Sequence, residues 1–370
     1  MKLARDTWKT AFRVAIGLLL LLWIVHSIFV NEARTLARQG RLQDPAGQRV
    51  DWGGLSRWEQ WRHGWREGPP ALAANLASVD RRAFVGALAL MGVMLYLGAA
   101  RWRLALQAQG LELPFRRVLH LTLVAQFFNA FLLGTVGGDV AKAYYAARET
   151  HHKKTEAVLT VFADRVIGLW GMLLFGSVMV LPNWELLTRP GLRTAAALLL
   201  CMMAGATLFT RLAFRGGVSQ AWRGAHDWLR RLPRGAWLEQ TLESCRQFGR
   251  RGSFVPLSLG LSMLVNAIMV LQFHVLAQGL HLHVSFIALA LVVPIVICVA
   301  ALPIAPSGLG VRENLFVQLL AAPVIGVHAT PALSLSLLAY AASLIWSLIG
   351  GLAYMTLKER PGLKQLAAEE

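Results

Sequence analysis

Three clusters of charged and small residues interrupt the apolar stretches of this 370-residue chain. The first consists of Asn129, Gly137, Gly138, Asp139 and Lys142, the second of Asp164 and Arg165, and the third of Ser307, Gly308, Gly310, Arg312 and Glu313. Ionisable groups in apolar surroundings are costly and usually functional. The clusters are therefore candidates for binding a charged group such as a phosphate.

The first cluster has the composition of a tight turn followed by a helix. Its glycines allow a sharp turn and a close approach of the backbone. Asp139 is placed to cap the helix that follows, and the free N–H groups at such a start can hold an anion. Lys142 comes about one turn later, where it can pair with Asp139 or meet a phosphate. The alternative is a capped turn with a lysine that reaches out of the membrane.

The second cluster lies inside a predicted helix. If that helix starts near residue 155, Asp164 and Arg165 lie ~14 Å along it. Adjacent residues do not face each other, so each needs a partner elsewhere. We expect Lys142 to pair with Asp164, and Asp139 or Glu313 to pair with Arg165. The alternative is a structural network of ion pairs that fixes helix packing.

The third cluster repeats the order of the first, with small residues followed by the charged pair Arg312-Glu313. A short apolar stretch follows it, so the pair is expected at the start of a short helix. The alternative is again a capped turn.

The elements that must position these clusters are membrane helices. Hydrophobic residues make up 56% of the chain and charged residues 15%, against ~25% charged in a soluble domain. Windows of about the length that spans a bilayer occur at 11–30, 83–100, 166–181 with 156–165 leading in, 194–213, 254–280, 284–302 and 332–357. Two further apolar stretches, at 118–133 and 315–327, look too short to cross alone. The sequence therefore predicts an all-α polytopic membrane protein without a large soluble catalytic domain.

The formal net charge of +17 comes from basic residues between the windows. Positive-inside topology and anionic lipid headgroups explain this charge better than nucleic acid does. The three cysteines form no disulfide or metal pattern. No cofactor is expected.

Charge sidedness predicts two re-entrant hairpins. If the window 118–133 crossed the membrane fully, the basic loop 214–253 would lie outside, against the positive-inside rule. The 16 residues of this window would cover only ~24 Å as a helix, short of the ~30 Å core. We therefore predict a hairpin that turns at 134–138 and opens to the cytoplasm, and a second one, over 284–327, that opens outward. With about six spanning helices, this is the pattern of an inverted repeat, in which transporters bind substrate where broken helices meet.

The predicted organisation has four parts. Residues 1–30 form an uncleaved first transmembrane helix, and 31–82 form an extracytoplasmic segment rich in tryptophan and arginine, either a surface flap or a lid over a route for lipid. Residues 83–357 form the transmembrane domain with the cytoplasmic loop 214–253, and 358–370 form a cytoplasmic tail. Both termini are expected in the cytoplasm, and the membrane is expected to be the cytoplasmic (inner) one.

Several short motifs follow one another in a fixed order. They are Arg101-Trp102-Arg103, Asn129 before the glycine turn, Gly137-Gly138-Asp139 with a base at 142, Asp164-Arg165-x-x-Gly168, and Pro306-x-Gly308-x-Gly310-x-x-Glu313. In these motifs the chain resembles the transmembrane, flippase-like region of lysylphosphatidylglycerol synthases, over about residues 83–357. It departs from the family at Leu133, where proline is common, and at Lys142, where arginine is frequent. Lysine keeps the charge but lacks the bidentate fork.

The resemblance implies handling of membrane lipids: aminoacylated phospholipids, polyprenyl-linked sugars or hopanoid-type lipids. Bifunctional relatives carry an aminoacyl-transferase domain after the membrane region, but this chain stops 13 residues after Leu357, so aminoacyl transfer is not expected. The leading hypothesis is a lipid translocase rather than an enzyme, with the bilayer and a membrane lipid as partners and no nucleic acid. No P-loop is present, so movement would not use ATP.

In this hypothesis the headgroup crosses a polar cavity between the two hairpins. The bases that would neutralise it are Lys142, Arg165 and Arg312, and the balancing carboxylates are Asp139, Asp164 and Glu313. One alternative is a membrane-embedded enzyme on a lipid-linked phosphate or sugar, with Asp139 or Asp164 as its base. Another is a non-transporting partner subunit of a lipid-modifying enzyme.

Overall fold

The structure is a computed structural model that describes most of the chain. The described residues are 50–131, 137–150, 153–181, 190–215, 253–300, 310–322 and 325–356, with 22, 25, 26, 29, 30, 32–34, 36, 37, 42 and 248 individually. Among them the regular structure is helical throughout, without a strand. The prediction of an all-α protein is confirmed.

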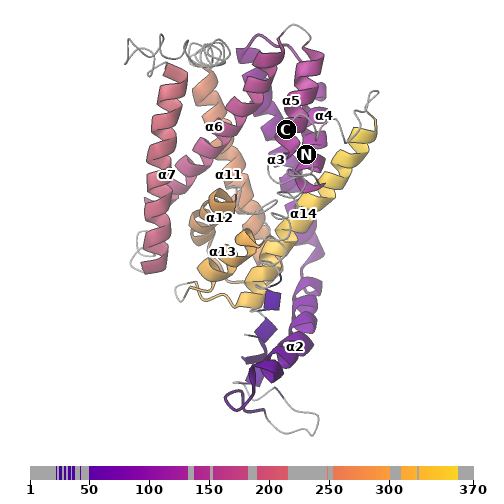
Figure 1. The fold of residues 1–370 in the computed structure, drawn as a ribbon, viewed down its shortest axis with the longest axis vertical. Helices are drawn as coiled ribbons and strands as arrows, with labels where there is room; N and C mark the ends of the chain where they lie inside the picture. The colour runs from indigo at the N-terminus through magenta and orange to yellow at the C-terminus, as the bar shows by residue number, and fades with distance from the viewer. Residues whose placement is uncertain are drawn as a thin grey trace, which may run out of the picture. The chain divides into compact units, whose positions relative to one another are not determined.

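Four described helices are long and apolar enough to cross a membrane: α3 (Arg81–Ala108), α6 (Lys154–Val180), α11 (Phe254–Gly279) and α14 (Ala329–Met355). At ~1.5 Å per residue each exceeds the ~30 Å hydrocarbon core. The helix α7 (Pro190–Arg215) contains the apolar stretch Ala196–Thr210. The chain is thus a multi-pass membrane protein (Figure 1). A total of six crossings stays a prediction, since most of residues 1–30 lie outside the described residues.

Two pairs of short helices stand where the hairpins were predicted. The first pair is α4 (Phe115–Phe131) with α5 (Gly137–Glu149), and the second is α12 (Phe286–Ala300) with α13 (Val311–Leu320). The members of each pair pack against each other. Their lengths of 17, 13, 15 and 10 residues are too short to span the core. The connections 132–136 and 301–309, including Ser307 and Gly308, lie outside the described residues.

The chain divides into two compact units. The first consists of residues 1–89 and 270–343, and the second of residues 90–269 and 344–370. The α12–α13 pair belongs to the first unit and the α4–α5 pair to the second. A cavity shared by the two hairpins stays a prediction.

The core of the second unit joins α3, α4 and α6 through large side chains. Trp102, Phe128 and Ile167 are fully buried. Trp102 Nε1 donates a hydrogen bond of 3.2 Å to Thr160 Oγ1, which fixes the indole ring between α3 and α6. The α5 helix packs along α6. This core holds the elements that carry the first two charged clusters.

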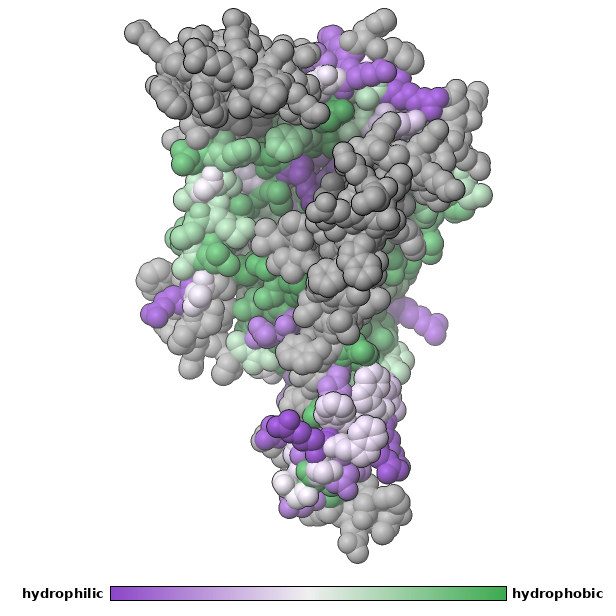
Figure 2. All heavy atoms as spheres, viewed as in Figure 1, coloured by the Kyte–Doolittle hydropathy of each residue, from purple (hydrophilic) through white to green (hydrophobic). Residues whose placement is uncertain are grey.

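A separate helix, α2 (Arg57–Ala77), lies within the predicted extracytoplasmic segment. Ser56 and Glu59 form a reciprocal capping box at its start, and these hydrogen bonds from Ser56 lower the pKa of Glu59. Trp58, Trp61 and Trp65 are exposed, and Trp65 Nε1 donates to His26 Nδ1 over 2.9 Å. On the face drawn in Figure 2 the surface over α2 is largely hydrophilic, which suits a helix outside the hydrocarbon core.

Candidate functional site

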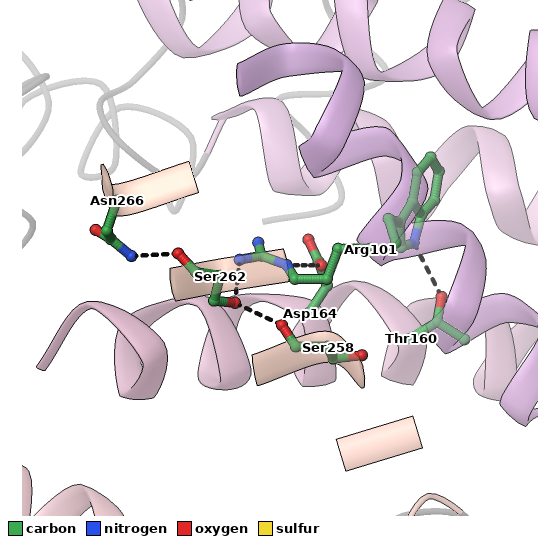
Figure 3. Close-up of polar contacts among 7 residues, drawn as sticks. Arg101, Thr160, Asp164, Ser258, Ser262 and Asn266 are labelled. Atoms are coloured by element: carbon green, nitrogen blue, oxygen red, sulfur yellow. Dashed lines mark hydrogen bonds and ion pairs between the residues drawn. The ribbon is translucent and has the colours of Figure 1, made fainter. Parts of the chain in front are cut away.

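A buried ion pair connects α3, α6 and α11 of the second unit. Arg101 Nε donates to Asp164 Oδ1 over 2.7 Å, and Arg101 Nη1 donates to Ser262 Oγ over 2.9 Å. The two charged side chains are only 15% and 9% exposed. Ser262 Oγ donates to the Ser258 carbonyl, and Asn266 Nδ2 donates to the Ser262 carbonyl (Figure 3). The pair is thus embedded in a polar network that holds three helices together.

Gly168 makes room for this pair. It lies four residues after Asp164, on the same face of α6. A Cβ atom at Gly168 would lie 2.9 Å from both terminal nitrogens of Arg101. The glycine therefore lets the guanidinium rest directly on the helix, which gives a physical reason for the spacing of Asp164 and Gly168 in the motif.

The expected pairing of Asp164 with Lys142 was wrong, because Arg101 takes this place. Sequence reasoning missed Arg101 as a partner because the apolar window ends at residue 100. The helix α3 nevertheless continues to Ala108, so Arg101 lies inside a helix and not in a loop. The available signal was the motif Arg101-Trp102-Arg103, whose central tryptophan is fully buried.

A second ion pair joins α5 to α6. Arg165 Nη1 donates to Asp139 Oδ2 over 2.8 Å. Asp139 is one of the two partners that were predicted for Arg165. These side chains are 33% and 26% exposed, so they are more accessible than Arg101 and Asp164. A ligand could reach this pair, whereas the first pair is enclosed by protein.

The start of α5 is fixed by Asn129 and not by Asp139. Asn129 Oδ1 accepts a hydrogen bond of 2.9 Å from the Gly138 N–H. A Cβ atom at Gly138 would lie 2.3 Å from the Ala125 carbonyl oxygen, so only glycine lets α5 approach α4 this closely. The expectation that Asp139 is the cap is corrected because α5 already begins at Gly137. Asp139 lies in the first turn, and its carboxylate bonds to Arg165.

Lys142 adds a second base to this region. It follows Asp139 by three residues on α5, so the two side chains are neighbours on the helix surface. Its ammonium lies 5.0 Å from the centroid of the Trp102 ring, a cation–π geometry. Because the Trp102 side chain is itself hydrogen-bonded to Thr160, the aromatic ring that Lys142 contacts is held in place.

The described residues of the third cluster, Gly310, Arg312 and Glu313, form a capped turn in the first unit. Glu313 is fully buried and accepts hydrogen bonds from the Gly310 N–H, at 2.7 Å, and from Arg312 Nε, at 3.1 Å. Gly310 has a φ of 82°, which favours glycine. The Arg312 guanidinium lies 4.8 Å from the centroid of the Tyr340 ring. Arg312 and Glu313 begin α13 as predicted, and their charges balance each other.

The part of the chain that the structure describes shows no cluster of metal-binding side chains. His, Cys, Asp and Glu side chains there form no group of three or more that could hold a metal ion.

The helices and their charge pairs define a polytopic membrane protein with balanced ionic groups inside apolar helices. The family described as "Lysylphosphatidylglycerol synthase TM region" matches residues 61–351. The chain belongs to this family. The match begins within α2, earlier than the start near residue 83 expected from the motifs. A search of curated proteins found no match to the chain.

Proposed function

We propose that this protein moves the anionic or zwitterionic headgroup of a membrane lipid between leaflets without ATP. The lipid would be a phospholipid or a polyprenyl-linked or hopanoid-type lipid. Membership of a lysylphosphatidylglycerol synthase family supports a role with membrane lipids. The observation that carries the proposal is the partly exposed Asp139–Arg165 pair beside Lys142.

The two ion pairs that involve α6 suit different tasks. The Arg101–Asp164 pair is enclosed, and Ser262 satisfies a further donor of the guanidinium, so it suits helix packing. The Asp139–Arg165 pair is accessible, and a headgroup phosphate could replace the carboxylate at Arg165. Arginine binds phosphate through two parallel N–H donors. Asp139 would balance the arginine between ligands, because an uncompensated charge at membrane depth costs ~2.5–3.5 kcal/mol or more.

The test is lipid exchange in proteoliposomes that contain fluorescent phospholipids or a fluorescent polyprenyl phosphate. Wild type is compared with Asp139→Asn, Arg165→Gln and the double variant. We expect the double variant to fold, because both charges are removed together, but to exchange lipid at least tenfold more slowly. The matched control is Arg117→Gln with Glu149→Gln, a pair of similar exposure (38% and 21%) that also involves α5. It should exchange lipid at the wild-type rate.

Two results would contradict the proposal. If wild type exchanges no lipid class faster than empty liposomes, the protein is not a translocase under these conditions. If the Asp139/Arg165 double variant exchanges lipid as fast as wild type, the pair is structural and does not handle the headgroup.

A further inference from the structure

The helix α2 presents a row of exposed tryptophans in the first unit. Trp58, Trp61 and Trp65 are 73%, 49% and 44% exposed, and their spacing of i, i+3 and i+7 places them along one side of the helix. Since one such side chain can bury ~150–250 Å², the row exposes roughly 300 Å² of aromatic surface. A patch of this size is near the largest on a typical monomer and is often functional. The row belongs to none of the three charged clusters.

Two glycines fix α2 against the first helix, whose described helical residues lie between 22 and 37. A Cβ atom at Gly68 would lie 2.2 Å from Phe29 Cγ, and one at Gly64 would lie 3.0 Å from Val30 Cα. The glycines therefore let the two helices approach this closely. Since Phe29 faces Gly68 and Val30 faces Gly64, α2 runs antiparallel to the first helix.

Two of the tryptophans are ordered by contacts with the same histidine. Trp65 Nε1 donates to His26 Nδ1 over 2.9 Å, and the Trp61 ring meets the His26 ring edge-on, with 4.8 Å between the centroids. Trp65 also packs edge-on against Phe29 at 5.3 Å. Because these rings are held in place before a partner arrives, docking on them loses little conformational entropy.

The tryptophan row stands clear of the lipid headgroups. Leu72 packs against Leu333 near the start of α14, which marks the predicted outer boundary of the membrane. Because α2 follows the first helix, which is predicted to cross the membrane, it leads away from this boundary. Trp65, Trp61 and Trp58 then lie ~10, ~16 and ~21 Å beyond Leu72 along the helix, whereas the headgroup layer is only ~5–8 Å deep. A lipid surface is therefore out of reach of most of the row.

Arginines flank the tryptophan row on both sides. At ~100° per residue, Arg57 and Arg62 lie ~70° to either side of the centre of the row, whereas Glu59 and Glu67 lie more than ~120° away from it. Both arginines are exposed. Glu59 belongs to the capping box, and Glu67 forms an ion pair with Arg66. The α2 surface around the row is thus basic, and charge complementarity favours an acidic partner.

The same charges disfavour a second copy of this chain as the occupant. Two copies in one membrane would be related by an axis along the membrane normal, so their α2 helices would run parallel. Residues five apart face each other across the seam of a parallel pair. With the tryptophans at the seam, Arg57 of one copy would lie opposite Arg62 of the other, and these like charges repel.

We propose that the tryptophan row of α2 docks the acidic surface of a water-soluble protein on the predicted extracytoplasmic side. Tryptophan and arginine are the residues most enriched among interface hot spots. Trp58, the most exposed of the three, would enter an apolar pocket of the partner, and Arg57 and Arg62 would meet carboxylates around it. This role does not depend on the proposed lipid translocation.

The first measurement is site-specific photocrosslinking of the full-length chain in intact cells of its native host. p-Benzoylphenylalanine replaces Trp58, Trp61 or, as a matched control on the polar side of α2, the exposed Arg66. Adducts are identified by mass spectrometry. We expect one acidic extracytoplasmic protein to be crosslinked from positions 58 and 61, at least fivefold more than from position 66.

The second measurement is binding of that protein, once purified, to the full-length chain in detergent. Trp58→Ala should weaken binding at least tenfold, as is usual for a hot spot. Arg57→Glu/Arg62→Glu should weaken it at least tenfold and remove most of its salt dependence. The matched control Arg81→Glu/Arg82→Glu changes the net charge equally at exposed positions of α3, and it should bind as wild type does. Equal unfolding temperatures should show that these surface substitutions leave the fold intact.

The proposal is overturned if lipid or a second copy of the chain is the main adduct, if position 66 crosslinks as well as position 58, or if no adduct forms. It is also overturned if the crosslinked protein binds Trp58→Ala or the charge-reversed variant as tightly as wild type. Because docking needs no transport, wild type that binds the partner but exchanges no lipid contradicts only the translocase. Lipid exchange without an adduct contradicts only the docking surface.

Discussion

Replacing Asp164 by asparagine tests whether the buried pair is a structural element. The change leaves the Arg101 guanidinium, 15% exposed, facing a neutral amide. Breaking a buried pair by removing one partner costs ~3–5 kcal/mol. With ~2–4 °C for each kcal/mol in a unit of this size, we expect the unfolding temperature to fall by roughly 10 °C. Removing both charges together in Arg101→Met/Asp164→Leu should restore most of this loss, because apolar replacements of a buried pair are often neutral or stabilising.

The measurement is thermal unfolding of the purified variants in detergent, followed by lipid exchange of those that fold. Arg117→Gln is the comparison, since it breaks a more exposed pair worth ~1 kcal/mol or less. The reasoning is refuted if Asp164→Asn unfolds at the wild-type temperature. It is also refuted if the double variant is stable but no longer exchanges lipid, because the pair would then act on the ligand.

Two further predictions concern glycines at close contacts. Gly168→Ala should lower the unfolding temperature in wild type but much less in an Arg101→Met background, since the Cβ atom meets the guanidinium at 2.9 Å; a double-mutant cycle measures this coupling. Gly138→Ala should reduce the yield of monodisperse protein in size-exclusion chromatography, because its Cβ would lie 2.3 Å from the Ala125 carbonyl oxygen. Gly205→Ala is the control, with no atom within 4 Å, and an equal yield for both variants would contradict the packing argument.

Hydropathy located the long helices but not the polar contacts inside them. A window ends where charge begins, whereas a helix ends where its backbone hydrogen bonds end. Arg101 closes the apolar window, yet α3 continues because the buried residues Trp102, Ala105 and Leu106 follow it on the same helix. A charged residue followed by buried apolar ones therefore fell outside the predicted window, and its pairing with Asp164 was missed.

Which charged side chains pair with each other depends on tertiary structure, so the sequence could narrow the candidate partners only in part. The rule that adjacent helical residues face different directions correctly separated the partners of Asp164 and Arg165. It could not say which helix faces each side chain, so Asp139 was found among two candidates while Arg101 was not considered.

The contacts at the two ends of the α4–α5 pair support the predicted re-entrant hairpin. At one end, the Cβ position of Gly110 lies 3.5 Å from Lys153 Nζ, and Arg117 pairs with Glu149. At the other end, Asn129 bonds to the backbone of Gly138. The chain thus returns after α5 to the place where it entered α4. With 17 and 13 residues, these helices cover ~25 and ~20 Å, less than the ~30 Å core.

We therefore predict that both ends of this hairpin face the same compartment, and cysteine labelling can test this directly. In a variant without the native cysteines, Glu112→Cys and Thr150→Cys should react with a membrane-impermeant maleimide from one side, predicted to be the cytoplasm. His281→Cys should react from the opposite side, because α11, a helix of 26 residues, is long enough to cross. If Thr150→Cys and Glu112→Cys react from opposite sides, the α4–α5 segment crosses the membrane fully. The basic loop 214–253 would then have to lie outside, or another crossing would have to be assigned before it, and the two-hairpin topology would be wrong.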